Sequence, residues 1–347
     1  MILIILKLNL KTKENILICP LNWGLGHATR DIPIIKYILA QNKNVIIGGN
    51  GQTIELLKKY FPDLQYIKIY SPSVFYGKKK SFSLIFYVFF MRYIFSAVIE
   101  HFFIKKIIKN YDISVIISDN RMGLWNKKIS SIFISHQLNI FLNHKQQKKS
   151  FLASKINSFL IKKYDYVIVP DFENENLSLA GRLSKNTENF RTKYIGAISR
   201  FQQKLHFDKE NKLYDYLCIL SGPEPQRTIL ENLLIQKFKD SNYNVLIIRG
   251  LPLYKAFPVN VKNISFFNDL ETPNLEELIK KSENIICRSG YTSIMDLTVI
   301  ERKAILIPTP NQPEQEYLAQ RMKEKFGYIV VNQNDIKYLN KSTFHFS

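Results

Sequence analysis

The chain contains little cysteine and no recognisable metal-binding spacing. Only three of its 347 residues are cysteines, and Cys19, Cys218 and Cys287 each lie in or at the end of an apolar run. This excludes a disulfide framework in practice and predicts buried structural thiols in a reducing, cytoplasmic compartment. Because the sequence also lacks an Asp-x-Asp pair and a His/Cys cluster, we expect neither a bound metal nor a cofactor.

Acidic residues are also scarce. The chain has 29 Asp and Glu against 49 Lys and Arg, which gives a formal net charge of +20. Such an excess predicts attraction to polyanions, namely phosphorylated substrates, anionic lipid surfaces or nucleic acid. The hydrophobic fraction of 46% is sufficient for packed cores, and the length favours two domains over one.

No segment reads clearly as a signal peptide or a membrane span. The apolar start at 1–6 lacks a basic region and a cleavage site. Ser81–Ile99 approaches the length of a spanning helix, but Arg92 interrupts it, and a central charge costs about 2.5–3.5 kcal/mol on insertion scales. We expect an amphipathic or buried helix here. Contact with a membrane face and packing into the core remain two equal alternatives.

Apolar strand-like runs alternate with segments of helical period along almost the whole chain. This pattern predicts an α/β protein with parallel sheets in doubly wound, Rossmann-like domains. Polar stretches at 172–193 and 201–212 show no hydrophobic period. They place the domain boundary near 198–210, and we assign the domains to residues 1–200 and 201–347.

The first strand-to-helix turn contains Gly24, Gly26 and His27. A nicotinamide-dinucleotide site does not fit it, because Thr29 replaces the third glycine of the fingerprint and the next strand ends without an acidic residue. His27 could instead accept a proton near neutral pH. Asp119 follows another apolar run, so a His27–Asp119 pair is a candidate base with its orienting carboxylate. A structural histidine and a helix-capping aspartate are the alternatives.

The most informative motif begins at Cys287. The apolar run ending there is followed by Arg288, Ser289 and Gly290, which let a helix start near Tyr291 with unpaired amide hydrogens. A helix start of this kind attracts a diphosphate. Asp296, within the first two turns, is suited to accept the hydroxyls of a ribose.

Further candidates lie at other predicted strand ends. Arg288 is the best anion ligand among the arginines, and the alternative for any one arginine is a surface position. The remaining candidates are residues of three turns and one residue at the hinge between the domains: Ser221, Gly222, Arg249, Glu314, Gln315, Glu316 and Arg200. An ordinary βαβ unit with solvated loops is the simpler alternative, but the joint placement of these residues makes it less favoured.

Taken together, these motifs resemble the family 28 glycosyltransferases of the GT-B fold. The match runs from the Gly24–His27 loop, through the Ser221-Gly222 turn, to the 287–290 motif and the 314–317 block. The resemblance implies two Rossmann-like domains facing across a cleft, with the acceptor in the first domain, the nucleoside diphosphate sugar in the second, and no metal requirement.

The resemblance also implies roles for individual residues. Asp296 would bind the donor ribose, and Gln315 with Glu316 would bind the donor sugar. The Ser221-Gly222 turn and the Ser289-Gly290 helix start would hold the diphosphate. His27 would be the base or an acceptor ligand, with Asp119 as its partner.

Two departures separate the chain from the peptidoglycan N-acetylglucosaminyltransferase of that family. Asp296 stands where that enzyme usually has glutamate, and Glu316 replaces the second amide of a Gln-Gln pair. We therefore predict a different transferase. It would use a nucleoside diphosphate sugar, most simply a uridine one, and would be inverting, with a hydroxyl, phosphate-linked or glycolipid acceptor at the inner membrane face.

Two other functions are compatible with parts of the sequence. A UDP-sugar 2-epimerase shares the fold, but it needs several carboxylates near the sugar, and only Glu314 and Glu316 are evident. A basic nucleic-acid-binding protein would cluster its charge with aromatics on one face, whereas the lysines here are spread along the chain.

Overall fold

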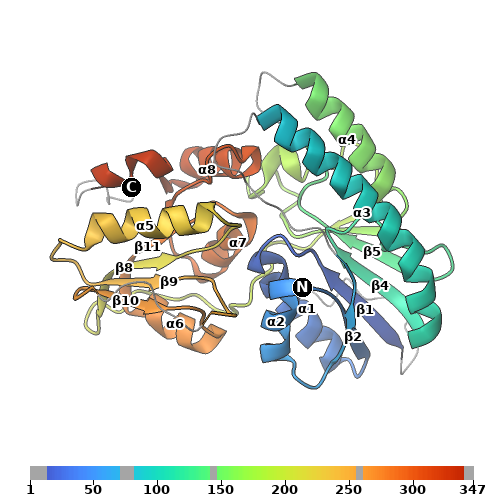
Figure 1. The fold of residues 1–347 in the computed structure, drawn as a ribbon, viewed down its shortest axis with the longest axis horizontal. Coiled ribbons are helices and arrows are strands. Elements are labelled where there is room, and N and C mark those ends of the chain that lie inside the picture. The colour runs from blue at the N-terminus through green and yellow to red at the C-terminus, as the bar shows by residue number, and fades with distance from the viewer. Residues whose placement is uncertain (1–13, 71–81, 141–146, 255–260, 340–347) are drawn as a thin grey trace. The chain divides into compact units, whose positions relative to one another are not determined.

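The computed structural model describes residues 14–70, 82–140, 147–254 and 261–339. These residues form two compact units that divide between Ile198 and Ser199. Each unit is a parallel β-sheet with helices packed on it, which confirms the predicted α/β class (Figure 1).

The N-terminal unit contains a seven-stranded sheet in the order β3-β2-β1-β4-β5-β6-β7. Its strands are β1 Asn15–Pro20, β2 Asn44–Gly49, β3 Gln65–Lys68, β4 Ile113–Asp119, β5 Ser130–Ile134, β6 Tyr166–Val169 and β7 Thr192–Tyr194. Its helices are α1 Leu25–Ala40, α2 Gly51–Tyr60, α3 Phe82–Tyr111 and α4 Gln147–Ile161, with a 3₁₀ turn at Gly181–Leu183.

Side chains along the central strands alternate between two cores. Ile16 and Ile18 of β1 pack in a cluster with residues of α1 and α2, whereas Leu17 and Cys19 pack with Ile104 of α3. Successive residues of a strand point to opposite faces, so a continuous apolar run is buried only where helices cover both faces. The apolar runs of the sequence therefore follow from the doubly wound arrangement.

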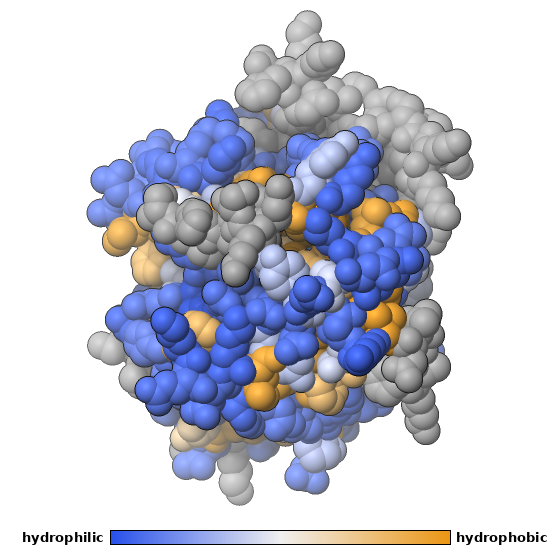
Figure 2. All heavy atoms as spheres, turned by 90° about the vertical axis from the view of Figure 1, so that its left-hand side faces the viewer, coloured by the Kyte–Doolittle hydropathy of each residue, from blue (hydrophilic) through white to orange (hydrophobic). Residues whose placement is uncertain are grey.

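The C-terminal unit repeats this plan with six parallel strands in the order β10-β9-β8-β11-β12-β13. The strands are β8 Tyr214–Ile219, β9 Val245–Ile248, β10 Ile264–Phe267, β11 Ser282–Cys287, β12 Ile305–Leu306 and β13 Ile329–Val330. The helices are α5 Gln226–Phe238, α6 Thr272–Lys280, α7 Tyr291–Ile300 and α8 Pro313–Phe326, with a 3₁₀ segment at Gln333–Tyr338. The face of this unit seen in Figure 2 is mainly hydrophilic with small apolar patches.

Each sheet has one topological switch point, where the strand order reverses. In the N-terminal unit it lies between β1 and β4, whose ends pair at Pro20 and Asp119. In the C-terminal unit it lies between β8 and β11, which pair up to Ile219 and Cys287. Open parallel sheets bind ligands at the carboxyl ends of the strands beside such a point. A ligand-binding site is therefore expected at the loops that follow these four strands.

Two elements differ from the sequence-based expectations or refine them. The polar stretch at 172–193, which shows no hydrophobic period, runs into β7, whose three residues pair with β6 and are too few to show a period. The apolar segment at 81–99 forms most of α3, apart from Ser81, which lies outside the described residues. Within the described ranges, no helix is both long enough and apolar enough to cross a membrane.

Candidate functional site

His27 lies at the N-terminal switch point, in the first turn of α1. The loop after β1 reaches this helix through Gly24, whose φ of 135° lies in a region that favours glycine. Thr29 Oγ1 donates a hydrogen bond to the carbonyl of Gly26 at 3.0 Å and closes the turn around His27. The glycines predicted to form a ligand loop thus fix the direction in which α1 presents its first side chains.

The structure brings His27 and Asp119 into contact. His27 Nδ1 lies 3.0 Å from Asp119 Oδ2, and the Asp119 side chain is fully buried at the end of β4. If Nδ1 carries the proton and donates a hydrogen bond to the carboxylate, the lone pair of Nε2 is left to accept a proton. This is the geometry of a general base with an orienting carboxylate.

Arg30 completes this cluster, and the sequence analysis missed it. Its Nε donates to Asp119 Oδ2 at 2.8 Å and its terminal nitrogen pairs with the other carboxylate oxygen. The same terminal nitrogen lies 2.9 Å from His27 Nδ1. Because Arg30 follows His27 by three residues, helical spacing puts both on one face of α1. This three-residue spacing in the sequence could have identified Arg30 as a neighbour of His27.

Burial and charge act in opposite directions on this cluster. Burial alone would raise the pKa of Asp119, but the Arg30 guanidinium and the His27 ring outweigh it and hold that pKa below its usual range. Burial lowers the pKa of His27, and the Asp119 carboxylate opposes the shift only in part. His27 is therefore neutral at neutral pH, as a base must be before it acts.

Aromatic side chains and a second histidine surround the cluster. The rings of Trp23 and Tyr93 lie 5.5 Å apart, which places an aromatic pair beside the β1–α1 loop. His136 follows β5, the neighbour of β4, and is buried close enough to His27 to lower its pKa. His136 therefore lies in the neighbourhood of the His27 cluster.

At the C-terminal switch point, Ser221 and Gly222 follow β8, and Ser289 and Gly290 follow the adjacent β11. Gly290 precedes the first residue of α7, as predicted for the helix start. Neither glycine has a neighbouring atom within 4 Å of the position that a Cβ would occupy. The Ser289 hydroxyl is already used, since it donates to the Gln315 carbonyl at 2.8 Å. Backbone N–H groups and open space are therefore what this turn offers to an anion.

Asp296 lies in the second turn of α7. Its side chain interacts with the segment that begins the C-terminal unit. Ser199 Oγ donates to Asp296 Oδ1 at 2.5 Å, and Arg200 is close enough to act on its charge. Burial raises the pKa of Asp296 to about 6, while Arg200 and Ser199 oppose that rise. The carboxylate predicted to bind a ribose is thus mostly ionised at neutral pH and sensitive to mild acid.

Gln315 and Glu316 stabilise the loop before α8 by accepting hydrogen bonds from its backbone. Gln315 Oε1 accepts the Thr309 N–H at 2.9 Å, and Glu316 Oε1 accepts the Asn311 N–H at 3.0 Å. Gln315 is buried, whereas Glu314 in the first turn of α8 is half-buried. The predicted contact with a donor sugar would have to be made by groups of this block other than those oxygens.

Two arginines predicted as donor ligands are turned into the protein instead. Arg288 is fully buried, and its guanidinium donates to the carbonyls of Ile307, Pro308 and Gln226 and to the Gln333 side chain. Arg249 is buried against Glu231 and donates to Asn268 Oδ1 at 2.7 Å. Carbonyl and amide oxygens occupy both terminal nitrogens of Arg288, and carboxylate and amide oxygens occupy Nε and Nη1 of Arg249, so a direct anion contact of either arginine stays a prediction. They hold the loops at the switch point.

The chain is similar in sequence to known glycosyltransferases. The Glycosyltransferase family 28 C-terminal domain matches residues 217–343. A UDP-N-acetylglucosamine–N-acetylmuramyl-(pentapeptide) pyrophosphoryl-undecaprenol N-acetylglucosamine transferase of Prochlorococcus marinus (strain MIT 9301) is 26% identical over 207 residues. That match covers 54% of this chain and about half, 56%, of the relative. An uncharacterized glycosyltransferase of Methanosarcina mazei is 21% identical and covers 88% of this chain and 82% of its own length.

The fold is shared with solved glycosyltransferases. The spinosyn rhamnosyltransferase SpnG complexed with thymidine diphosphate superposes with a TM-score of 0.61 and 10% sequence identity. The match covers 95% of this chain and 91% of that enzyme. An identity this low shows the fold alone, and the fold is that of two parallel-sheet units in one chain.

Proposed function

We propose that this chain, a GT-B protein with the C-terminal domain of family 28 glycosyltransferases, transfers a sugar from a nucleoside diphosphate sugar to an acceptor hydroxyl. The domain match over residues 217–343 carries the proposal, because it includes the strand β11, the open turn at Gly290 and the carboxylate of Asp296. We propose that these features bind the diphosphate and the ribose of the donor.

The donor half of the mechanism rests on the C-terminal switch point. The backbone N–H groups at the start of α7 and the positive end of its dipole would hold the diphosphate. The Asp296 carboxylate would accept the ribose hydroxyls. Negative charge grows on the diphosphate as the glycosidic bond breaks, so these donors stabilise the transition state more than the ground state. This arrangement would work without a metal ion or cofactor.

The acceptor half rests on the His27 cluster. The acceptor oxygen would form a bond to the anomeric carbon while the bond from that carbon to the diphosphate breaks. His27 Nε2 would take the hydroxyl proton, and Asp119, 3.0 Å from Nδ1, would stabilise the resulting imidazolium. A single displacement of this kind inverts the anomeric configuration.

A membrane-associated acceptor is supported by the surface of α3 and α4, which both pack on one hydrophobic cluster of the N-terminal unit. We call this surface the aromatic face. Its exposed apolar residues are Phe95, Val98, Phe102 and Phe103 of α3 and Phe151, Leu152 and Phe159 of α4.

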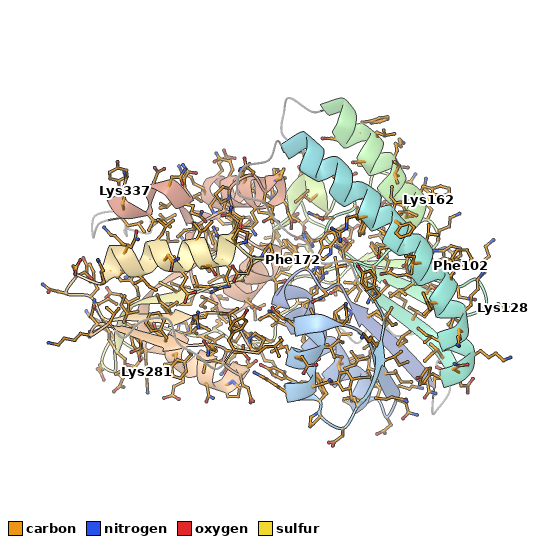
Figure 3. All side chains as sticks on the ribbon, in the orientation of Figure 1. Phe102, Lys128, Lys162, Phe172, Lys281 and Lys337 are labelled. Carbon is orange, nitrogen blue, oxygen red and sulfur yellow. The ribbon has the colours of Figure 1, made fainter. Side chains whose placement is uncertain are left out.

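The aromatic face is framed by cations. Lys105, Lys106 and Lys109 are exposed near the end of α3, and the Lys163 ammonium lies 4.4 Å from the centre of the Phe159 ring. Figure 3 shows Phe102 on α3 and Lys162 near the end of α4. Aromatic residues beside lysines suit the interface of an anionic bilayer. We therefore propose a lipid-linked or glycolipid acceptor and a peripheral location on the cytoplasmic membrane face.

The proposal is tested first by ligand-induced stabilisation. A panel of nucleotide sugars, free nucleotides and oligonucleotides is screened by thermal shift with the full chain. We expect one nucleotide sugar, most simply a uridine one, and its nucleoside diphosphate to raise Tm. Stabilisation by oligonucleotides alone would exclude a glycosyltransferase. Product analysis without acceptor then distinguishes epimerisation, which needs only the donor, from transfer.

A further inference from the structure

A second buried carboxylate lies beside the His27 cluster and has no role in the mechanism above. Asp31 follows Arg30 on α1 and is fully buried. No N–H or O–H group in the described part of the chain donates a hydrogen bond to either of its oxygens. A buried ionised carboxylate without a donor is strongly disfavoured, so its charge state needs an explanation.

The neighbour of Asp31 supplies that explanation. Asp31 directly follows Arg30, whose guanidinium pairs with Asp119, so the charge of the buried Asp119 carboxylate acts on Asp31. Two ionised carboxylates can only accept hydrogen bonds and repel each other, which favours a proton on one of them. Asp119 already receives N–H donors from Arg30 and contacts His27, which favour its ionised form. Asp31 receives none, so the proton belongs to Asp31.

We infer that Asp31 is a protonated carboxylic acid at neutral pH, which donates its O–H to Asp119 and keeps the cluster of His27, Arg30, Asp31 and Asp119 at zero net charge. The inference makes Asp31 a positioning residue for the base, and this role rests on the proposed function. Burial and the adjacent Asp119 charge raise the pKa of Asp31 well above its ordinary value, in agreement with the geometry.

All charged and titratable groups known to act on Asp31 fit this arrangement. Arg30 on the same helix contributes a positive charge, which the Asp119 carboxylate on β4 balances. Cys19 on β1 also senses Asp31, but burial raises the pKa of its thiol to about 12, so it is uncharged. With Asp31 protonated, the resting cluster is neutral. An ionised Asp31 would add a second negative charge to the cluster. That charge would raise the pKa of His27 and favour its protonated form, which cannot act as a base.

The first test uses the pH dependence of stability. The unfolded chain releases the Asp31 proton near the ordinary aspartate pKa of about 3.9, whereas the folded chain retains it. The contribution of Asp31 to the free energy of unfolding is therefore fully present below about pH 3.9. It is lost as the pH rises towards the raised pKa of Asp31 in the folded chain. Asp31→Asn imitates the protonated acid without this loss. We expect Asp31→Asn to have a higher Tm than the wild type, by a margin that widens from about pH 5 to about pH 8.

Two variants serve as controls. Asp31→Ala removes the donor to Asp119 and should be less stable than Asp31→Asn at every pH. Asp119→Asn removes the buried anion and should destabilise strongly, because it leaves the Arg30 charge unpaired. An Asp31→Asn margin that does not widen as the pH rises from about 5 to about 8 would show that Asp31 is ionised in the folded chain, and would overturn the inference.

The second test follows His27 directly by NMR titration of its imidazole. Asp31→Asn should leave the His27 pKa at its wild-type value, because the charge of the cluster does not change. A fall in that pKa would mean that a negative charge had been removed. If Asp31→Asn does not fold, the wild type labelled with ¹³C at the aspartate carboxyl groups decides. One carboxyl carbon should keep a protonated chemical shift at neutral pH, and its absence would refute the inference. None of these readouts depends on glycosyl transfer, so they can fail or succeed independently of the proposed function.

Discussion

At the scale of single residues, His27 is defined by its partners more than by its position in the sequence. Its Nδ1 contacts Asp119 and Arg30, and the environment lowers its pKa. A neighbouring glycine loop would be compatible with many functions. The buried carboxylate and guanidinium are what make this histidine a candidate base.

We expect His27→Ala to reduce kcat by about 10²–10⁴-fold while the donor affinity stays near normal, since general-base catalysis contributes an effect of this size. In the wild type, kcat/KM should fall as the pH decreases through the His27 pKa. That acid limb should lie below the ordinary histidine value of about 6.5. Steady-state kinetics over pH check both points. The exposed His206 provides the matched control, and its alanine variant should keep wild-type rates. Unchanged turnover in His27→Ala would remove His27 from the mechanism.

Asp296 gives a second prediction at this scale. Because burial raises its pKa to about 6, the carboxylate that we propose to bind the ribose should ionise as the pH rises through that value. The affinity for the nucleoside diphosphate should increase over the same range. Asp296→Asn should abolish the dependence and weaken binding by about 10–100-fold, the loss expected for hydrogen bonds to a charged group. Calorimetric titration across pH measures this, and exposed Asp335→Asn is the control. A pH dependence that survives in Asp296→Asn would assign it to another group.

At the scale of elements, two glycine-containing turns that each follow a strand of the C-terminal sheet differ in what surrounds them. Gly290 has φ −69° and open space where a Cβ would lie, so any residue could fold there. Gly250 has φ +66° and the Leu220 carbonyl oxygen lies 2.5 Å from the Cβ position, so a side chain there is strained and crowded. Glycine at 250 is required by the fold, whereas glycine at 290 is not.

We therefore expect Gly290→Val to fold with nearly the wild-type Tm and to lose at least about tenfold in affinity for the nucleoside diphosphate, because the added methyl groups enter the space before α7. Gly250→Val should lower Tm clearly. Thermal melting and calorimetry of both variants separate the two effects. Wild-type affinity in Gly290→Val would exclude the start of α7 as the diphosphate site.

At the scale of the whole molecule, charge and the aromatic face bear on the same question. The chain has a net charge of +20, and its exposed aromatic residues on α3 and α4 are accompanied by lysines. Neither property alone indicates a membrane, since an AT-rich coding sequence also gives lysine and single exposed aromatics are common. The two together predict binding to anionic vesicles.

We expect co-sedimentation with anionic vesicles that weakens as salt is raised and is far weaker with neutral lipid. The double variant Phe102→Ser and Phe159→Ser should bind at least about tenfold more weakly, because each buried phenylalanine contributes about 1.5–3 kcal/mol. Tyr338→Ser, which changes an equally exposed aromatic residue of the C-terminal unit, is the control. Equal binding to neutral and anionic vesicles, or no effect of the double variant, would contradict an electrostatic and aromatic membrane contact.

The sequence by itself determined the alternation of strands and helices, the parallel sheets and the turns that carry His27, Ser221, Gly290 and Asp296. These follow from local composition and period, which a strand or a helix start imposes on its own residues. The pairing of His27 with Asp119 could be anticipated because both follow strands of one sheet.

Only the tertiary structure decided which side chains reach those strand ends. Arg288 and Arg249 follow buried strands like the other candidates, but they turn towards carbonyl and carboxylate groups inside the unit. Arg30 and Asp31 are adjacent in sequence, yet Arg30 pairs with Asp119, whereas no group of the described residues donates a hydrogen bond to the Asp31 carboxyl group. The direction of a side chain and its state of protonation depend on neighbours distant in the chain. Local sequence therefore could not specify them.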